Sequence, residues 1–298
     1  MMKLNGIVAI SFGLILALPF PSRAQNLEPI KIAVNGVELH YIEAGTGETV
    51  ILLHGGTGDY RSWSLHWEEF ARNYHVVSYS RRYHYPNNNP KILKDFSALN
   101  EAKDLAALIQ KLKLGRVHLV GSSYGAFTAL ALALEQPKMV RSLVLSEPPI
   151  HSWMTGTEGY RDFMANWDRC RSAFRQGDQT EAMKIFTDGL FGSGYFDRLP
   201  PATSSAMMQN ARAIEALALS SNPFPNLSKD KVMKLNVPTL ILTGTHTIKI
   251  HRAVDDELAR ILSGAKHVIV PNAGHATARD NPEQYRATVL DFLAKQPH

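Results

Sequence analysis

Apolar positions along the chain alternate between short buried strands and amphipathic helices. Two segments with alternating apolar residues, 30–34 and 37–43, flank Asn35-Gly36, a pair that predicts an antiparallel hairpin. Apolar runs then predict four buried strands, over 49–53, 76–79, 117–120 and 142–145. Helical periodicity predicts helices over 97–114 and 125–136. Short apolar strands that alternate with helices predict a parallel sheet covered on both faces.

This alternation stops between residues 148 and 234. The segment shows helix-like stretches over 160–175, 178–190 and 202–220, and no pattern of a buried strand. Strand patterns return at 239–243 and 267–270, with a helix at about 252–262 between them and a last helix from Asn281-Pro282. We therefore predict an α/β core formed by residues 25–147 and 235–298, and an inserted helical lid over 148–234.

Composition supports a folded protein and limits its chemistry. The 298 residues are 45% hydrophobic and 20% charged, which is enough apolar material for a sizeable core. The single cysteine, Cys170, excludes an internal disulfide framework, a thiolate zinc site and an iron–sulfur cluster. Basic residues are scattered, and the densest group, within 103–116, fits the solvated face of a helix. We expect no nucleic-acid partner, no metal and no cofactor.

The amino-terminal segment has the pattern of a secretory signal peptide. Lys3 precedes an apolar run over 7–20, and Ser22-Arg23-Ala24 places small residues where signal peptidases cleave. The run is shorter than the roughly 20 apolar residues that span a bilayer. Residues 1–24 are therefore predicted to be removed after Ala24. This predicts an exported protein, periplasmic or secreted, without a stable membrane anchor.

A candidate nucleophile lies between a predicted strand and a predicted helix. Gly121-Ser122-Ser123-Tyr124-Gly125 fits G-x-S-x-G in that context. The central serine, Ser123, would lie at the tip of a sharp turn, and the two glycines would let strand and helix approach each other. The start of the helix also directs free N–H groups and a positive dipole end toward that site. A turn with a purely structural role is the alternative.

With this elbow, residues 27–296 resemble an α/β-hydrolase-fold protein with a helical cap. The turn His54-Gly55-Gly56 resembles the oxyanion loop of that family, which implies that the backbone N–H groups of Gly56 and Tyr124 bind a developing negative charge. His54 is then expected to be structural. The segment 80–85 is partly similar to the family's D-x-R-G-H-G pattern, since Arg82 and His84 match and Ser80, Tyr83 and Tyr85 do not.

The general base should follow the last predicted strand. His275 does so within Asn272-Ala273-Gly274-His275, and the order of serine first and histidine last agrees with the family. The alternative is a polar loop residue. We treat the other eleven histidines as packing or surface residues, with His84, His151 and His246 the least clear.

The acid of the triad departs from the usual family pattern. Most members carry an aspartate after the strand that corresponds to 239–243, where this chain has Thr247, and Asp255 and Asp256 fall within a predicted helix. Glu147 directly follows the strand 142–145, at the sheet edge where sites of open α/β folds gather. Some haloalkane dehalogenases resemble this arrangement. We therefore assign Glu147 as the residue that orients His275; a solvent-facing glutamate is the alternative.

These residues predict a serine hydrolase that cleaves carboxylic esters, lactones or thioesters through an acyl-enzyme. A serine at position 123 argues against dehalogenase and epoxide-hydrolase chemistry, which in this family resembles attack by a carboxylate. Hydrolysis of a C–C bond or an enol lactone, or cofactor-free haloperoxidase-like chemistry, is a second hypothesis. A non-catalytic ligand-binding member of the fold is a third, because of Thr247. The aromatic residues of the lid suggest a small to medium, partly apolar substrate.

Overall fold

A computed structural model describes residues 28–296. Within that range the sheet has eight strands in the order β1-β2-β4-β3-β5-β6-β7-β8. The strands are β1 (Ile30–Val34), β2 (Val37–Ala44), β3 (Thr49–Leu53), β4 (His75–Tyr79), β5 (Val117–Ser122), β6 (Val140–Ser146), β7 (Thr239–Gly244) and β8 (Lys266–Val270). β2 is antiparallel to β1 and β4, and all pairs from β4 to β8 are parallel. The predicted hairpin and parallel sheet are thus confirmed.

The sheet separates two apolar layers because alternate strand residues face opposite sides. Ile51 and Leu53 of β3 contribute to the larger layer, while Val50 and Leu52 contribute to the other. Helices α2 (Ala98–Lys111), α3 (Tyr124–Glu135) and α9 (Lys249–Ile261) pack in the larger layer. Helices α1 (Trp67–Ala71) and α11 (Pro282–Leu293) cover the opposite face.

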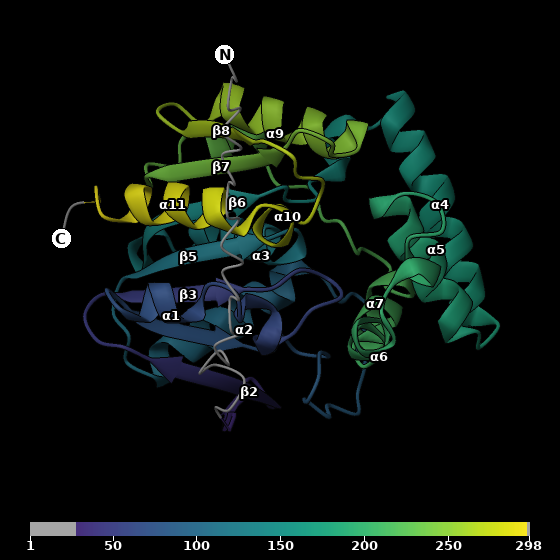
Figure 1. The fold of residues 1–298 in the computed structure, drawn as a ribbon, viewed down its shortest axis with the longest axis horizontal. Helices are drawn as coiled ribbons and strands as arrows, with labels where there is room; N and C mark the ends of the chain where they lie inside the picture. The colour runs from purple at the N-terminus through teal and green to yellow at the C-terminus, as the bar shows by residue number, and fades with distance from the viewer. Residues whose placement is uncertain (1–27, 297–298) are drawn as a thin grey trace, which may run out of the picture.

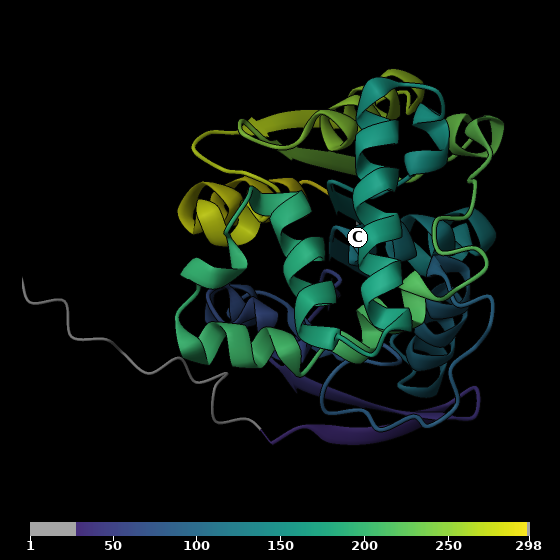
Figure 2. The same ribbon diagram turned by 90° about the vertical axis from the view of Figure 1, so that its right-hand side faces the viewer.

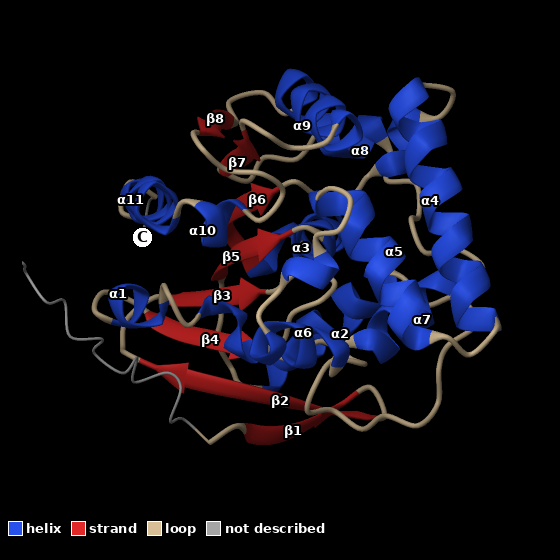
Figure 3. Cartoon of the chain, turned by 45° about the vertical axis from the view of Figure 1, so that its right-hand side comes forward, coloured by secondary structure: helices blue, strands red, loops and turns tan. Residues whose placement is uncertain are grey.

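The helical insert, residues 148–234, contains helices and no strand, and the structure describes all of it. They are α4 (Glu158–Arg175), α5 (Gln179–Phe191), α6 (Pro201–Met208), α7 (Ala211–Ala218) and α8 (Lys229–Met233), with short 3-10 turns η4 (His151–Met154) and η5 (Phe196–Arg198). Helices α4 to α7 of the insert lie together beside the sheet in Figure 1 and in front of it in Figure 2, whereas α8 lies next to α9 in Figure 3. Figure 3 shows that the carboxyl ends of β3 and β5 point toward the insert.

The single helix expected over 202–220 is instead two helices, α6 and α7, and this prediction was wrong. Asn210 lies at the break, and its buried side chain bonds to two distant segments. Its Nδ2 donates to Asp59 Oδ2 at 3.0 Å, and its Oδ1 accepts from the Tyr85 backbone N–H at 2.9 Å. These bonds link the insert to the core. The periodicity of apolar residues along the chain cannot reveal such long-range side-chain bonds.

Short helical elements were also missed by the pattern of apolar positions. They are α1, α8, α10 (Thr277–Asp280) and the 3-10 turns η2 (Tyr60–Trp63), η3 (Pro137–Met139), η4 and η5. Elements of three to five residues are too short for a 3.6-residue period to be read.

The predicted signal peptide, residues 1–24, lies outside the described residues. None of the helices within residues 28–296 combines the length and the apolar character needed to cross a bilayer.

Candidate active site

Ser123 lies at the sharp turn between β5 and α3, with φ of 52° and ψ of −121°. A positive φ is unfavourable for a side chain with a Cβ, so the surrounding backbone must hold it there. The neighbouring glycines are required by close approach. A Cβ on Gly121 would lie 2.6 Å from Ala126 Cα, and one on Gly125 would lie 2.4 Å from the Leu53 carbonyl oxygen. The turn therefore presents the Ser123 hydroxyl beyond the sheet edge, as the motif predicts.

His275 follows β8 and contacts both expected partners. Its Nε2 is 3.0 Å from Ser123 Oγ, and its Nδ1 is 2.6 Å from Glu147 Oε2. A carboxylate can only accept, so Nδ1 carries the proton and Nε2 accepts from the serine hydroxyl. The imidazole is buried. This is the tautomer in which Nε2 can remove the serine proton.

Glu147 directly follows β6, is fully buried and has φ of 50°. The carboxylate accepts three hydrogen bonds. Oε1 accepts from the Gly244 backbone N–H at 2.9 Å, and Oε2 accepts from Thr247 Oγ1 at 2.6 Å and from His275 Nδ1. Donors on several sides compensate for the loss of water around a buried charge. The structure thus brings Ser123, His275 and Glu147 into one hydrogen-bonded chain.

Thr247 has a role that sequence reasoning missed. It occupies the position at which the family usually carries the acid, and its hydroxyl donates to the Glu147 carboxylate. Because β6 and β7 are neighbours in the sheet, a carboxylate after either strand can reach the same histidine. The sequence showed that the usual aspartate is replaced by Thr247, but it did not show that the Thr247 hydroxyl is a hydrogen-bond donor to Glu147.

The expected oxyanion loop lies next to the elbow. Gly56 and Tyr124 line the same small cavity as Ser123. Among the described residues, no protein acceptor takes the backbone N–H of either residue. A Cβ on Gly56 would lie 3.0 Å from Ile214 Cδ1, so a side chain there would crowd the insert. Two free N–H groups beside a serine hydroxyl are the arrangement that stabilises a tetrahedral oxyanion.

The side chain of Arg81 hydrogen-bonds to the backbone of the oxyanion loop. Its guanidinium donates to the carbonyl oxygens of His54 and Gly55, at 3.2 and 3.0 Å, and pairs with the buried Glu101. His54 accepts from the Arg81 backbone N–H at 3.1 Å, and burial lowers its pKa to about 3. A neutral, bonded imidazole is consistent with the expected structural role of His54.

The segment 80–85 is held by side-chain contacts, one of which reaches Gly58, just after the oxyanion loop. Ser80 Oγ donates to the Tyr85 carbonyl at 2.5 Å, and Arg82 forms two bonds of 2.7 Å with Asp104. His84 Nδ1 lies 2.7 Å from the Gly58 carbonyl oxygen. These contacts stabilise the loop and bring none of its side chains to the triad.

A family model described as alpha/beta hydrolase fold matches residues 48–282. The chain belongs to the α/β-hydrolase family. It is 24% identical over 287 residues to epoxide hydrolase 3 of Xenopus tropicalis, which covers 89% of this chain and 77% of that relative. It is 26% identical over 283 residues to a 2-hydroxy-6-oxononadienedioate/2-hydroxy-6-oxononatrienedioate hydrolase of Paraburkholderia xenovorans, covering 89% and 93%.

Solved structures agree on the fold. An esterase from Thermogutta terrifontis superposes with a TM-score of 0.72 at 23% identity, over 90% of this chain and 99% of that one. The α/β-hydrolase fold and the mostly parallel sheet, predicted from the sequence, are therefore confirmed. The coarse activity that these relatives share by name is hydrolysis.

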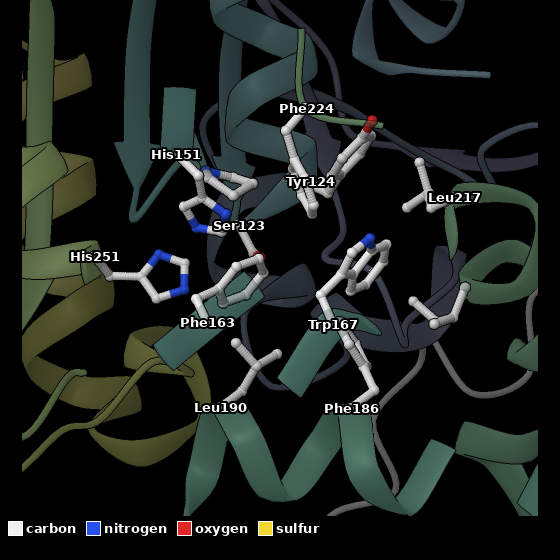
Figure 4. Close-up of a pocket in the computed structure, with 13 residues that line it drawn as sticks. Ser123, Tyr124, His151, Phe163, Trp167, Phe186, Leu190, Leu217, Phe224 and His251 are labelled. Carbon is white, nitrogen blue, oxygen red and sulfur yellow. The ribbon is translucent and has the colours of Figure 1, made fainter. Parts of the chain in front are cut away.

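Two cavities of this α/β-hydrolase meet at Ser123. Gly56, Ser123, Phe186 and Leu190 line both. The smaller cavity has a volume of about 20 Å³ and is shown in Figure 4; its wall is mainly aromatic and aliphatic. The larger one has a volume of about 430 Å³ and is lined by His275, by polar residues of the segment 57–66 and by apolar residues such as Phe191 and Met207. A substrate bound at Ser123 can thus extend in two directions.

Two further histidines border the site. His151 of η4 and His251 of α9 are buried, and both line the small cavity. The His251 ring stacks on His275, with centroids 4.2 Å apart and planes at 25°. Burial lowers the pKa of His151 to about 3 and that of His251 well below its usual value. Both imidazoles are therefore neutral near pH 7.

Glu147, His251 and His275 are the described residues that could hold a metal ion, since their ligand atoms lie within 4.8 Å of one another. Two of the three already bond to each other through His275 Nδ1 and Glu147 Oε2. A metal there would compete with the triad, so the donor set does not fit a resident metal.

Proposed function

We propose that this protein is a serine hydrolase of carboxylic esters, including lactones and thioesters, that acts through a Ser123–His275–Glu147 triad. The observation that carries the proposal is the continuous hydrogen-bonded chain from Ser123 Oγ through both nitrogens of His275 to Glu147 Oε2. This chain lies beside two free backbone donors, those of Gly56 and Tyr124. Nucleophile, base, orienting acid and oxyanion donors are the parts that acyl transfer needs.

In the first half of the reaction, His275 Nε2 takes the Ser123 proton as Oγ attacks the carbonyl carbon. The Gly56 and Tyr124 N–H groups bind the oxyanion, and Glu147 stabilises the imidazolium through Nδ1. As the tetrahedral intermediate collapses, His275 gives its proton to the leaving oxygen, and the acyl group stays on Ser123. In the second half, water attacks the acyl-enzyme, and the same groups release the acid.

The nucleophile type argues against the activity named in the first relative above. Attack of a serine oxygen on an epoxide or an alkyl halide would leave an ether on Ser123, and water does not cleave an ether under mild conditions. Attack on a carbonyl leaves an ester, which the same site can hydrolyse. The residue at position 123 therefore favours acyl transfer over ring opening of an epoxide.

Hydrolysis of a C–C bond next to a ketone is the second candidate, supported by the 26% identity to the 2-hydroxy-6-oxo acid hydrolase. It would use the same triad on a ketone carbonyl. The non-catalytic alternative loses its main support, because Thr247 donates to Glu147 and does not leave the triad without an acid.

Labelling with a fluorophosphonate tests the proposal. We expect covalent modification of Ser123, and a fall in kcat/KM of at least about 10³-fold for Ser123→Ala on short acyl phenyl esters. Ser122→Ala is the matched control, because Ser122 is the adjacent hydroxyl and lacks the bond to His275. A folded protein that does not label, or a Ser123→Ala variant with full activity, would overturn the proposal.

A further inference from the structure

His151 and His251 carry four ring nitrogens without a hydrogen-bond partner within the described residues. Each of the two residues is only 1% exposed, and both line the small cavity with Ser123. In Figure 4 the two imidazoles lie at one side of this cavity, and Trp167 and Leu217 lie at the other. Buried polar groups in folded proteins nearly always have partners. The unpaired nitrogens therefore indicate a partner that enters the cavity.

Aromatic contacts hold these two rings but do not replace a hydrogen bond. His151 lies 3.9 Å from Phe163 and 4.9 Å from Phe224 between ring centroids, and 5.2 Å from His251. His251 in turn stacks on His275. Aromatic neighbours on several sides fix the positions of the imidazoles. None of these ring contacts is a hydrogen bond, so a molecule that enters the cavity has to supply the partner.

The charge state of the two rings limits what that group can be. As neutral imidazoles, each offers one N–H donor and one nitrogen acceptor. The residues that line the small cavity include no lysine, arginine, aspartate or glutamate. A carboxylate entering this cavity would lose its hydration and meet no fixed positive charge. A neutral hydroxyl can bond to both the donor and the acceptor nitrogens, and a neutral keto oxygen can accept from the N–H donors.

The position of His275 indicates which part of the substrate enters. His275 lines the larger cavity and not the smaller one. The leaving oxygen must receive its proton from His275, so the alcohol part belongs in the larger cavity and the acyl part in the smaller. A volume of about 20 Å³ holds little more than one water-sized group, so only a very short acyl group enters without movement of the wall.

We infer that His151 and His251 form an acyl-chain subsite that binds a neutral hydroxyl or keto oxygen, so that the enzyme selects short hydroxyacyl or oxoacyl esters. The inference rests on the proposed ester hydrolysis and specifies its substrate class. The hydrogen bonds reach the acyl chain and not the scissile carbonyl. His151 and His251 are therefore specificity residues, distinct from the oxyanion donors Gly56 and Tyr124.

Matched phenyl esters test the inference. The glycolate and propanoate esters differ by a hydroxyl in place of a methyl group, and so do the 3-hydroxybutanoate and 3-methylbutanoate esters. After division by the rates of hydroxide hydrolysis, we expect kcat/KM of the wild type to favour at least one hydroxy ester by about 10- to 100-fold. In His151→Phe and His251→Phe, which keep a ring and lose the nitrogens, the ratio should fall toward one.

Phe224→Leu is the control, because Phe224 lines the same cavity and contacts His151 without hydrogen bonding. It should slow both members of a pair alike and keep their ratio. If the histidine variants do not fold, the normalised wild-type ratio decides alone. A wild-type ratio near one for both pairs, or one that both histidine variants retain, overturns the inference while the proposed function stands. No fluorophosphonate label and no hydrolysis of any ester overturns the proposed function, and with it the inference.

Discussion

The two sides of Ser123 are held by different forces. At the sheet edge, His275, Glu147 and Thr247 form hydrogen bonds of 2.6–3.0 Å that account for both imidazole nitrogens of His275. On the wall of the small cavity, His151 and His251 pack against rings and leave all four nitrogens unbonded. In the proposed reaction, the chemistry thus depends on groups that are fixed before the substrate arrives, whereas selectivity depends on groups whose partners the substrate brings.

The largest effect that would break this contrast is loss of the Glu147 charge. Glu147→Gln should lower kcat/KM by about 10³- to 10⁴-fold, because an amide can donate to His275 Nδ1 and so favour the wrong tautomer. Ester hydrolysis by the purified variant measures the effect. Asp255→Asn is the matched control, since Asp255 is equally buried and bonds to Thr243 instead of His275. A larger loss in the Asp255 variant would reassign the acid.

A smaller effect should come from the donor to that carboxylate. Thr247→Val removes the 2.6 Å bond to Glu147 Oε2 and keeps the shape of the side chain. A charge-assisted bond of this kind is worth about 1.5–3 kcal/mol. We expect its loss to lower kcat about tenfold, with little change in KM. Thr247→Ser restores the donor and should recover most of the rate. If the Thr247→Val variant and the wild type have equal rates, Thr247 does not position the acid.

The smallest effect concerns stability and sharpens the other side of the comparison. His151 has a pKa of about 3 in the folded protein, so below about pH 6.5 the unfolded chain takes up a proton that the folded protein does not. His54 and His66, with pKa values of about 3 and 4, act in the same direction. The contribution of these histidines to the free energy of unfolding is therefore fully present above about pH 6.5. It falls as the pH drops, by up to about 1.4 kcal/mol per pH unit for each histidine.

Urea unfolding between pH 7 and pH 5 measures this slope. His151→Phe should reduce it by up to about 1.4 kcal/mol per pH unit, since the contribution of His151 is gone. Phe224→Leu, which alters the same aromatic cluster without removing a titrating group, should keep the wild-type slope. A slope that His151→Phe leaves unchanged would mean that the His151 imidazole is as easily protonated in the folded protein as in the unfolded chain.

Local patterns predicted the parts of the site that neighbouring residues determine. The strand–turn–helix context of Ser123 and the glycine before His275 were readable because a sharp turn and a close approach leave a signature in adjacent residues. Glu147 required topology, namely that β6 and β7 end side by side. The donor role of Thr247 was missed because the sequence does not show that its hydroxyl points toward the Glu147 carboxylate.

The histidine subsite shows the same limit. His151 was noted only as unclear and His251 was not singled out, since they come from η4 and α9, on either side of most of the insert. Only folding places them 5.2 Å apart. The break at Asn210 was missed for a related reason, because side-chain bonds to Asp59 and Tyr85 decide it.

Placing the acid after β6 has a consequence for how this protein can vary. Ser123 and Glu147 are separated by a single β5–α3–β6 unit, and only the histidine is contributed after the insert. Two of the three proposed catalytic side chains thus come from one β5–α3–β6 crossover that precedes the insert in the sequence. Substitution of the insert helices, or a change in their length, should therefore alter substrate choice without changing the spacing between Ser123 and Glu147.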